Sequence, residues 1–539
     1  MASSSYNGLL RRRLLVILLL SVFFIQSYSS LKSKSASFDE VIYFGIGKYL
    51  LLNQKWDIMG SIVHPPLTYY LNSLPFLFVD EDKSLWQYEN VERDLIFLGA
   101  SDIYRGQRFL ASPENHNDRL LIQSRMMTLL VALLLGWYVY RFGRDLYGEW
   151  AGLLALLLFT FCPNTLALSG IAVPDIPLTA FSFIFIYYLW KCLRDRGTLN
   201  ILLAGFFLGL ALLCKFTALI LLPIAGMLCL MVACFEQKRV VTPALIIGGV
   251  SIFLLLAGYG FQLTPFLQGM IYRINQVEGG HLSFLMGEYS HKGWWYYYPV
   301  AFLLKTPLAF IMMLSVALVF LAKARGAALR DALFLFIPAA VIFLLFCSSS
   351  YSVALRYILP MYPFLFVLAG SLATEETRFK PLIVVGVLWY IGASLYIAPH
   401  YLAYFNELAG GPDNGYRYLV DGNLDWGQDL KGLKKFMDNN GVQRITFSYF
   451  GADSPRRYGI DYDWLPSYHL ENLHPDRPIP APEEQLVAVS ATNLMGTYLE
   501  PHDQYALLRN KKPVAKIGYS IFVYDFSGKS RTYKTNTKF

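Results

Sequence analysis

Two adjacent carboxylates, Asp39 and Glu40, follow within ten residues of the first long apolar stretch of the chain. A charged side chain beside a lipid bilayer is costly in free energy, so such residues are candidates for a function. One carboxylate can take a proton from a hydroxyl group, and a second can orient the reacting groups. The alternative is structural, because acidic residues also stabilise the N-terminus of a helix, expected here over residues 38–52. The two roles are compatible.

Two further residues, His64 and Asp175, are of types that take part in proton transfer and hydrogen bonding. His64 begins the sequence His64-Pro65-Pro66-Leu67, and the commoner role of a lone histidine is structural. Asp175 begins an expected helix and is followed by Pro177, so a helix cap is a strong alternative for it. We predict Asp39, Glu40 and Asp175 as the catalytic residues.

Basic residues form the second part of the candidate site. They lie near the ends of apolar stretches that we expect to face away from the cytoplasm: Arg125, Lys215, Lys305 and Arg356. Each alone could extend its aliphatic stem to the lipid headgroups. Together they run against the usual bias of membrane proteins, in which Lys and Arg concentrate on the cytoplasmic side. Four such cations at the other face therefore need an anion as a partner. A phosphate attached to a lipid fits, since Arg offers it a two-pronged fork and Lys a point charge. We predict that these four residues, with His64, bind such a phosphate.

No pattern of residues demands a metal ion. His281, Glu288, His291 and Lys292 have spacings unlike those of standard metal sites. Asp461-Tyr462-Asp463 resembles the metal-binding motif of enzymes that use nucleotide sugars, but these sugars are scarce outside the cell, where we expect this segment to lie. We expect no cofactor; a divalent metal is possible but not required.

The elements that position these residues are membrane helices. Of the 539 residues, 55% are hydrophobic and 16% charged, and the mean hydropathy is +0.40, which indicates a polytopic membrane protein and not a soluble one. A membrane-spanning helix needs about 20 apolar residues. We predict eleven spans, near residues 12–30, 121–140, 149–166, 176–192, 199–213, 217–235, 241–261, 299–322, 331–347, 353–372 and 381–399.

Lys and Arg residues concentrate in every second connection, beginning with Arg11 to Arg13. Such connections are usually cytoplasmic, so the N-terminus is expected inside and the C-terminus outside, with the first span retained as an anchor. Residues 1–399 are then a transmembrane catalytic domain with outer loops 31–120 and 262–298. Residues 400–539, whose strand-like runs and one helix-like run are of soluble type, form an extracytoplasmic α/β domain.

Several motifs resemble those of glycosyltransferase family 39, which has the GT-C fold and includes protein O-mannosyltransferases and aminoarabinose transferases. The first outer loop carries Phe38-Asp39-Glu40 and His64-Pro65-Pro66-Leu67. Bacterial members of the group have stretches similar to the following: Gly293 through Tyr298, Lys305-Thr306-Pro307-Leu308, Arg356 through Pro360, and Asn423 through Leu430. The tail after residue 430 is unlike the MIR domain of eukaryotic protein mannosyltransferases, which leaves a protein acceptor in doubt.

The resemblance implies a sugar donor on a polyprenyl phosphate, used at the outer face of an inner (plasma) membrane with inversion at the anomeric carbon. The acceptor stays open between a protein hydroxyl, lipid A and another glycolipid, and so does the sugar. Two other functions are compatible with the sequence: a flippase or transporter of lipid-linked sugars, and a scaffold whose outer tail binds a partner. The near absence of charge at the centres of the predicted spans argues against transport.

Overall fold

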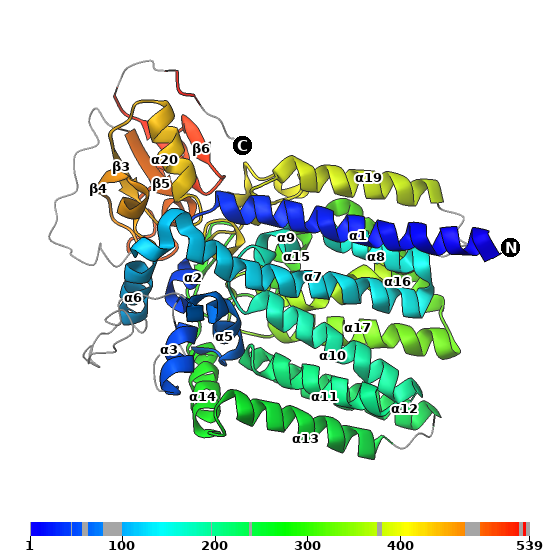
Figure 1. Ribbon diagram of the computed structural model, residues 1–539. Coiled ribbons are helices and arrows are strands. Elements are labelled where there is room, and N and C mark those ends of the chain that lie inside the picture. Colours follow the sequence, from blue (N-terminus) through cyan, green and yellow to red (C-terminus); the bar gives the residue numbers. More distant parts are fainter. Residues whose placement is uncertain are drawn as a thin grey trace.

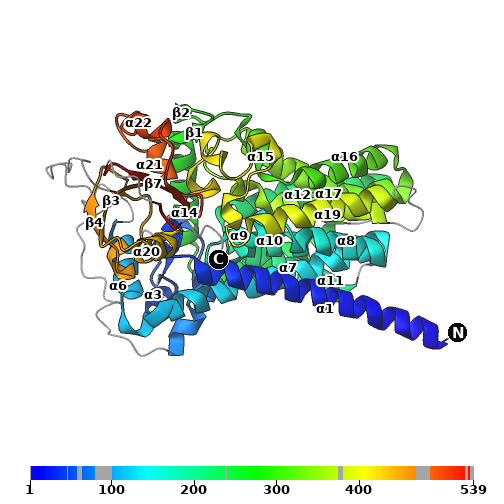
Figure 2. The same ribbon diagram turned by 90° about the horizontal axis from the view of Figure 1, so that it is seen from above.

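The computed structural model describes residues 2–44, 46–56, 63–78, 100–195, 197–236, 240–373, 380–468, 486–527 and 532–534. Long helices lie side by side in one bundle, and a small sheet domain lies beyond one end of that bundle (Figure 1). The N-terminus lies at the opposite end of the bundle, as the second view also shows (Figure 2).

Each of the eleven predicted spans corresponds to one or two helices. The helices concerned are α1 (Ala2–Ser33), α7 (Arg119–Tyr147), α8 (Glu149–Thr160), α9 (Pro163–Ser169), α10 (Asp175–Asp195), α11 (Thr198–Leu212), α12 (Leu221–Glu236), α13 (Val241–Gly258), α15 (Tyr297–Lys305), α16 (Leu308–Lys323), α17 (Gly326–Cys347), α18 (Tyr362–Gly370) and α19 (Lys380–Ile397).

By length and composition, seven of the helical segments in the described residues could cross a membrane. The number rises to nine when two bent pairs, α8 with α9 (64°) and α15 with α16 (113°), each count as one span. The remaining two predicted spans correspond to the shorter apolar helices α11 and α19. The polytopic helical fold expected from the sequence is therefore confirmed.

Burial along the helices distinguishes the centre of the bundle from its rim. In α10, 94% of the apolar window is buried, against 17% in α13. A helix that is apolar all round and exposed on one side fits a lipid environment, and α13 exposes Leu245 and Phe253 in this way. The central helix α10 begins at Asp175, so this carboxylate lies at the core of the bundle end.

The described residues of 31–120, the predicted first outer loop, fold into short helices against that end of the bundle. They are α2 (Phe38–Tyr43), α3 (Ile46–Asn53), α5 (Leu67–Ser73), η1 (Leu74–Phe78), α6 (Ala100–Leu110) and η3 (Pro113–Asp118). The helix predicted over 38–52 is thus two helices, because Phe44 adopts an extended backbone that ends α2. The second outer loop contains α14 (Thr264–Gly279) and a hairpin of β1 (Ser283–Leu285) and β2 (Glu288–Ser290).

The C-terminal segment forms a five-stranded sheet in the order β4-β3-β5-β7-β6. The strands are β3 (Arg444–Ser448), β4 (Asp461–Trp464), β5 (Leu486–Ser490), β6 (Ala515–Ile517) and β7 (Ile521–Asp525). β3 pairs in parallel with β4 and β5, whereas β7 pairs antiparallel with β5 and β6. The amphipathic helix α20 (Leu430–Asn439) buries Leu433 and Phe436 against this sheet. The sheet-containing domain expected at the C-terminus is present.

Backbone hydrogen bonds join the chain before α2 to the chain before α20. Ser35 N–H donates to Gln428 O (2.9 Å), and Phe38 N–H donates to Trp426 O (2.8 Å). Ser35 Oγ accepts from Leu430 N–H (3.1 Å). These contacts fix the start of α2, and therefore Asp39, relative to residues near 426.

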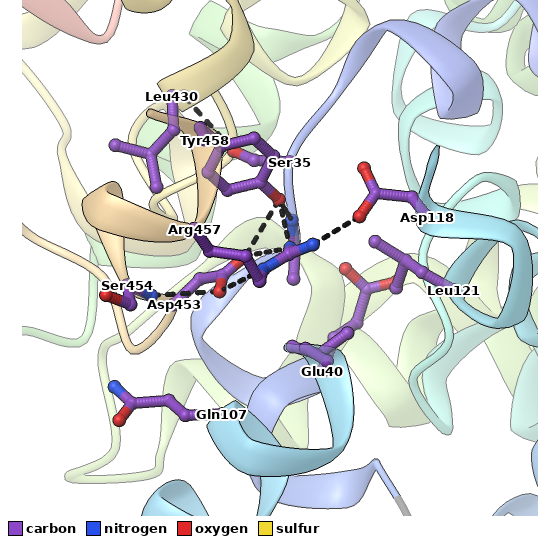
Figure 3. Close-up of polar contacts among 12 residues, drawn as sticks. Ser35, Glu40, Gln107, Asp118, Leu121, Leu430, Asp453, Ser454, Arg457 and Tyr458 are labelled. Atoms are coloured by element: carbon purple, nitrogen blue, oxygen red, sulfur yellow. Dashed lines mark hydrogen bonds and ion pairs between the residues drawn. The ribbon is translucent and has the colours of Figure 1, made fainter. Parts of the chain in front are cut away.

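A second junction lies beside the first (Figure 3). Arg457 of the C-terminal domain pairs with Asp118 of the first outer loop and with Asp453. Lys431 pairs with the same Asp118 at 2.6 Å. The first outer loop and the sheet domain are therefore held together by both backbone and charge contacts.

Candidate functional site

A cavity of about 280 Å³ lies where α2, the start of α10, α14 and the C-terminal segment meet. Five of the eight predicted site residues line it: Asp39, His64, Asp175, Lys215 and Arg356. Glu40, Arg125 and Lys305 are not among the lining residues. The structure thus brings together side chains from four distant parts of the sequence and separates three others from them.

Acidic and basic groups alternate along the cavity wall. Arg356 Nη1 donates to Asp39 Oδ2 at 2.8 Å and lies 4.0 Å from Asp175 Oδ2. Lys215 Nζ donates to Asp175 Oδ1 at 3.0 Å. Among the described residues, the buried atoms Asp175 Oδ2 and Arg356 Nε have no hydrogen-bond partner. Buried polar atoms seldom stay unpaired, so a ligand in the cavity is a natural partner for both.

Lys215 and His64 provide polar groups of different charge on the bundle side of the cavity. Lys215 lies between α11 and the 3-10 turn η4 (Phe216–Ile220), with Nζ 4.4 Å from the centre of the Tyr357 ring. Burial, with the positive charges of Arg273, Lys215 and Arg356, holds the pKa of His64 well below its ordinary value. His64 is therefore neutral at pH 7, and it can offer a phosphate a hydrogen bond but no charge.

Glu40 and Arg125 form a closed pair outside the cavity. Arg125 donates from Nε and Nη2 to the two carboxylate oxygens of Glu40, at 2.8 and 2.7 Å. Its other N–H groups donate to the carbonyl oxygens of residues 31, 34 and 35. Burial alone raises the pKa of Glu40, but Arg125 together with the backbone N–H groups of Ser37 and Ala172 lowers it below its ordinary value. All five donors of Arg125 are used, so the geometry favours a structural role for both residues over their predicted roles.

Lys305 is likewise saturated by the protein. Its Nζ donates to the carbonyl oxygens of Leu402 (2.9 Å), Tyr404 (3.0 Å) and Asn423 (2.5 Å). An ammonium group has three donors, so none is left for a phosphate. The geometry favours a role for Lys305 in fastening the end of α15 to the segment that follows α19.

Comparisons with known proteins identify the fold of this chain. Residues 119–259, about a quarter of the chain, match the model of the family described as dolichyl-phosphate-mannose-protein mannosyltransferase. The crystal structure of ArnT from Cupriavidus metallidurans in the apo state has a TM-score of 0.50 and 13% identity, with 97% of this chain and 98% of that chain covered. The chain has the GT-C glycosyltransferase fold.

Two further structures are similar to this GT-C chain. The same ArnT bound to undecaprenyl phosphate has a TM-score of 0.50 and 13% identity, covering 94% of this chain and 97% of that chain. The Archaeoglobus fulgidus oligosaccharyltransferase in the apo form has a TM-score of 0.45 and 14% identity, covering 70% of this chain and 54% of that chain. No curated protein matches the chain.

The GT-C chain also brings residues to the cavity that the sequence analysis did not assign. Arg273 of α14 adds a third basic side chain to Lys215 and Arg356. Its only sequence signal was a basic residue within outer loop 262–298. Trp426 lies in the stretch Asn423 through Leu430, which carried a family resemblance but no role. Its ring lies 4.0 Å from the Arg356 guanidinium, which it orients by a cation–π contact.

In the part of this GT-C chain that the structure describes, no group of three or more His, Cys, Asp or Glu side chains is placed so that it could hold a metal ion. His281 instead lines the cavity and contacts the Tyr351 and Tyr498 rings edge-on. In the DxD-like motif, Asp463 pairs with Arg444 at 2.6 Å.

Proposed function

We propose that this protein is a membrane glycosyltransferase that moves a sugar from a polyprenyl phosphate to an acceptor hydroxyl, with inversion at the anomeric carbon. The observation that carries the proposal is the cavity that Asp39 shares with three basic side chains, Lys215, Arg273 and Arg356, of which Arg356 contacts it directly. A carboxylate is the base that such a transfer needs, and the cations suit the phosphate that leaves. The shared fold with ArnT, which has been crystallised with undecaprenyl phosphate, supports a donor of this chemistry.

In the proposed reaction, Asp39 accepts the proton of the acceptor hydroxyl while the oxygen of that hydroxyl forms a bond to the anomeric carbon. The bond from that carbon to the phosphate oxygen breaks, and the polyprenyl phosphate leaves with the electron pair. Lys215, Arg273 and Arg356 stabilise the growing negative charge on the phosphate. Asp175 holds Lys215 and adjoins Arg356, so we assign it the role of positioning these cations. His64 is assigned a neutral hydrogen bond to the same phosphate.

The protein is a multi-pass membrane protein, and we propose that it resides in the inner membrane with its N-terminus in the cytoplasm. The cavity and residues 400–539 then face the periplasm. The separation of the N-terminus and the sheet domain at opposite ends of the bundle supports this placement (Figure 1). A cysteine introduced at Leu507, which is 90% exposed, should react with a membrane-impermeant maleimide in intact spheroplasts, whereas one at Arg13 should react only after lysis.

The test of the activity uses the full-length protein in nanodiscs with a panel of synthetic undecaprenyl-phosphate sugars and a cell-envelope extract as acceptor. We expect release of undecaprenyl phosphate and a glycosylated product by mass spectrometry. Release should fall sharply for Asp39→Asn and stay unchanged for the control Asp461→Asn, whose side chain is 69% exposed. Movement of the labelled donor across vesicle membranes with no product would overturn the proposal in favour of a flippase.

A further inference from the structure

The cavity has two chemically different ends. One end, which we call the cationic end, consists of Lys215 and Asp175 of the bundle, Arg273 of α14, and His64 from the segment before α5. Phe38, Phe450, Tyr468, Tyr498 and Asp421 form the other, which we call the aromatic end. In Figure 1, α2 lies between the sheet domain and α14. Asp39 directly follows Phe38 of the aromatic end, and its partner Arg356 lies 4.0 Å from Asp175, which accepts from Lys215 of the cationic end, so the Asp39–Arg356 pair links the two ends.

The aromatic end is a set of four rings that contact one another with planes inclined by 14° to 36°. Phe38 and Phe450 have centroids 5.7 Å apart with planes inclined by 24°, and Phe450 and Tyr498 lie 5.7 Å apart at 14°. Tyr468 lies 5.0 Å from Tyr498. Three of the rings are only partly buried. Such a surface offers apolar ring faces to a ligand with an apolar face of similar size.

Asp421 provides the polar group beside these rings. Its backbone is in the left-handed region (φ 54°), which is uncommon for a residue other than glycine. Its Oδ2 accepts from Tyr498 O–H (2.5 Å), its Oδ1 accepts from Gly422 N–H (2.7 Å), and its own N–H donates to Thr492 Oγ1 (3.1 Å). A carboxylate has about four acceptor positions, so positions remain for ligand hydroxyl groups. Such strain is commonly found at binding sites.

We propose that the aromatic end is the acceptor subsite and that the acceptor is a carbohydrate, such as the glycan of a glycolipid, and not a serine or threonine side chain. A pyranose ring has one face of C–H groups, which stacks on flat rings, and a rim of hydroxyl groups, which a carboxylate binds. A seryl side chain has no such face, and its single hydroxyl is the group that would react. This inference rests on the proposed function, because an inverting displacement requires the acceptor to enter opposite the leaving phosphate. With the phosphate at the cationic end, the acceptor enters from the aromatic end, and the Asp39–Arg356 pair links the two ends.

The experiment tests the two ends independently by measuring ligand binding and not catalysis. Full-length protein in nanodiscs is titrated with undecaprenyl phosphate, with a panel of fluorescent oligosaccharides of glucose, mannose and N-acetylglucosamine, and with a Ser/Thr-rich peptide. Two conservative variants, Asp421→Asn and Tyr498→Phe, remove the hydroxyl-binding groups; Asn tolerates the left-handed backbone, and Phe keeps the ring stack. The matched control is Tyr104→Phe, since this tyrosine is 64% exposed in α6. Thermal unfolding verifies that each variant is folded.

We expect at least one oligosaccharide to bind, and each variant to weaken that binding at least tenfold while changing undecaprenyl phosphate binding less than twofold. The control should change neither. The proposal is overturned if no oligosaccharide binds, if the peptide binds and the oligosaccharides do not, or if the variants leave oligosaccharide binding unchanged. It is also overturned if they weaken undecaprenyl phosphate binding equally. Failure of undecaprenyl phosphate itself to bind the wild type counts instead against the proposed function.

Discussion

Arg356 Nη1 lies 2.8 Å from Asp39 Oδ2, and the contact joins residues that are 317 positions apart in the chain. The contact fixes the position of the carboxylate that we propose as the base. We expect Asp39→Asn, which keeps the shape of the side chain, to lower turnover about 10²- to 10⁴-fold. Release of undecaprenyl phosphate from a synthetic donor measures this. Undecaprenyl phosphate affinity should change little; turnover at the wild-type level would show that another group is the base.

The cationic end can be tested without catalysis. Lys215→Met alone removes the hydrogen-bonded partner of the buried Asp175 carboxylate, so the double variant Lys215→Met/Asp175→Asn is the better probe. Loss of one charged partner of a phosphate is worth about 1.5–3 kcal/mol, or roughly tenfold to a hundredfold in the dissociation constant of undecaprenyl phosphate. Isothermal titration in nanodiscs measures this constant. Arg119→Ala, an exposed position on α7, is the control, and equal affinities for all three proteins would argue against a phosphate at Lys215.

The buried Glu40–Arg125 pair should affect stability more than binding. Removal of one partner leaves the other as an uncompensated charge, so Glu40→Gln and Arg125→Met should each lower the free energy of unfolding by about 3–5 kcal/mol. Denaturant unfolding in detergent, with Arg119→Ala as control, measures the loss. Protein that remains folded should bind undecaprenyl phosphate as the wild type does. Normal stability with lost phosphate binding would instead support the role that the sequence predicted for Arg125.

Asp425 gives the stability a defined dependence on pH. Burial raises the pKa of Asp425 to about 8, whereas an aspartate in an unfolded chain has a pKa of about 4. The folded protein thus holds a proton that the unfolded chain releases, so this group makes the free energy of unfolding fall as the pH rises from about 4 to about 8, by at most ~1.4 kcal/mol per unit.

Asp425→Asn removes this dependence and retains an oxygen that can accept from Thr492 N–H, as Asp425 Oδ2 does at 2.9 Å. The free energy of unfolding of the variant minus that of the wild type should therefore be larger at pH 8 than at pH 5, as thermal unfolding in the two buffers will show. Asp413→Asn, at a side chain that is 56% exposed, serves as the control. Wild-type and Asp425→Asn curves that run parallel would contradict a raised pKa.

Apolar stretches predicted the helical fold well, because a bilayer demands continuous runs that are visible in the sequence. The same reasoning placed Asp39, His64, Asp175, Lys215 and Arg356 at one membrane face, and the structure places all five around one cavity. A charged residue near the end of a predicted span is therefore a useful indication that it lies close to other such residues in the fold.

The partners of each charge could not be predicted in this way. Lys305 and Lys215 give the same signal, a lysine near the outer end of an apolar run, yet one binds three backbone carbonyls and the other borders the cavity. Arg125 is saturated by carbonyls that become available only where α1 ends. Arg273 gives no such signal, because its helix α14 lies within predicted outer loop 262–298 and not at the end of a predicted span. The contacts that decide whether a basic side chain is saturated by the protein or borders the cavity join segments that are far apart in the chain.

The Phe38–Trp426 backbone contact has a consequence for the order in which the cavity is completed during synthesis. Phe38 is synthesised early, whereas Trp426, which binds its backbone and contacts Arg356, is synthesised only after most of translation has finished. A nascent or prematurely terminated chain therefore lacks a complete cavity and, under the proposed function, cannot consume the lipid-linked donor.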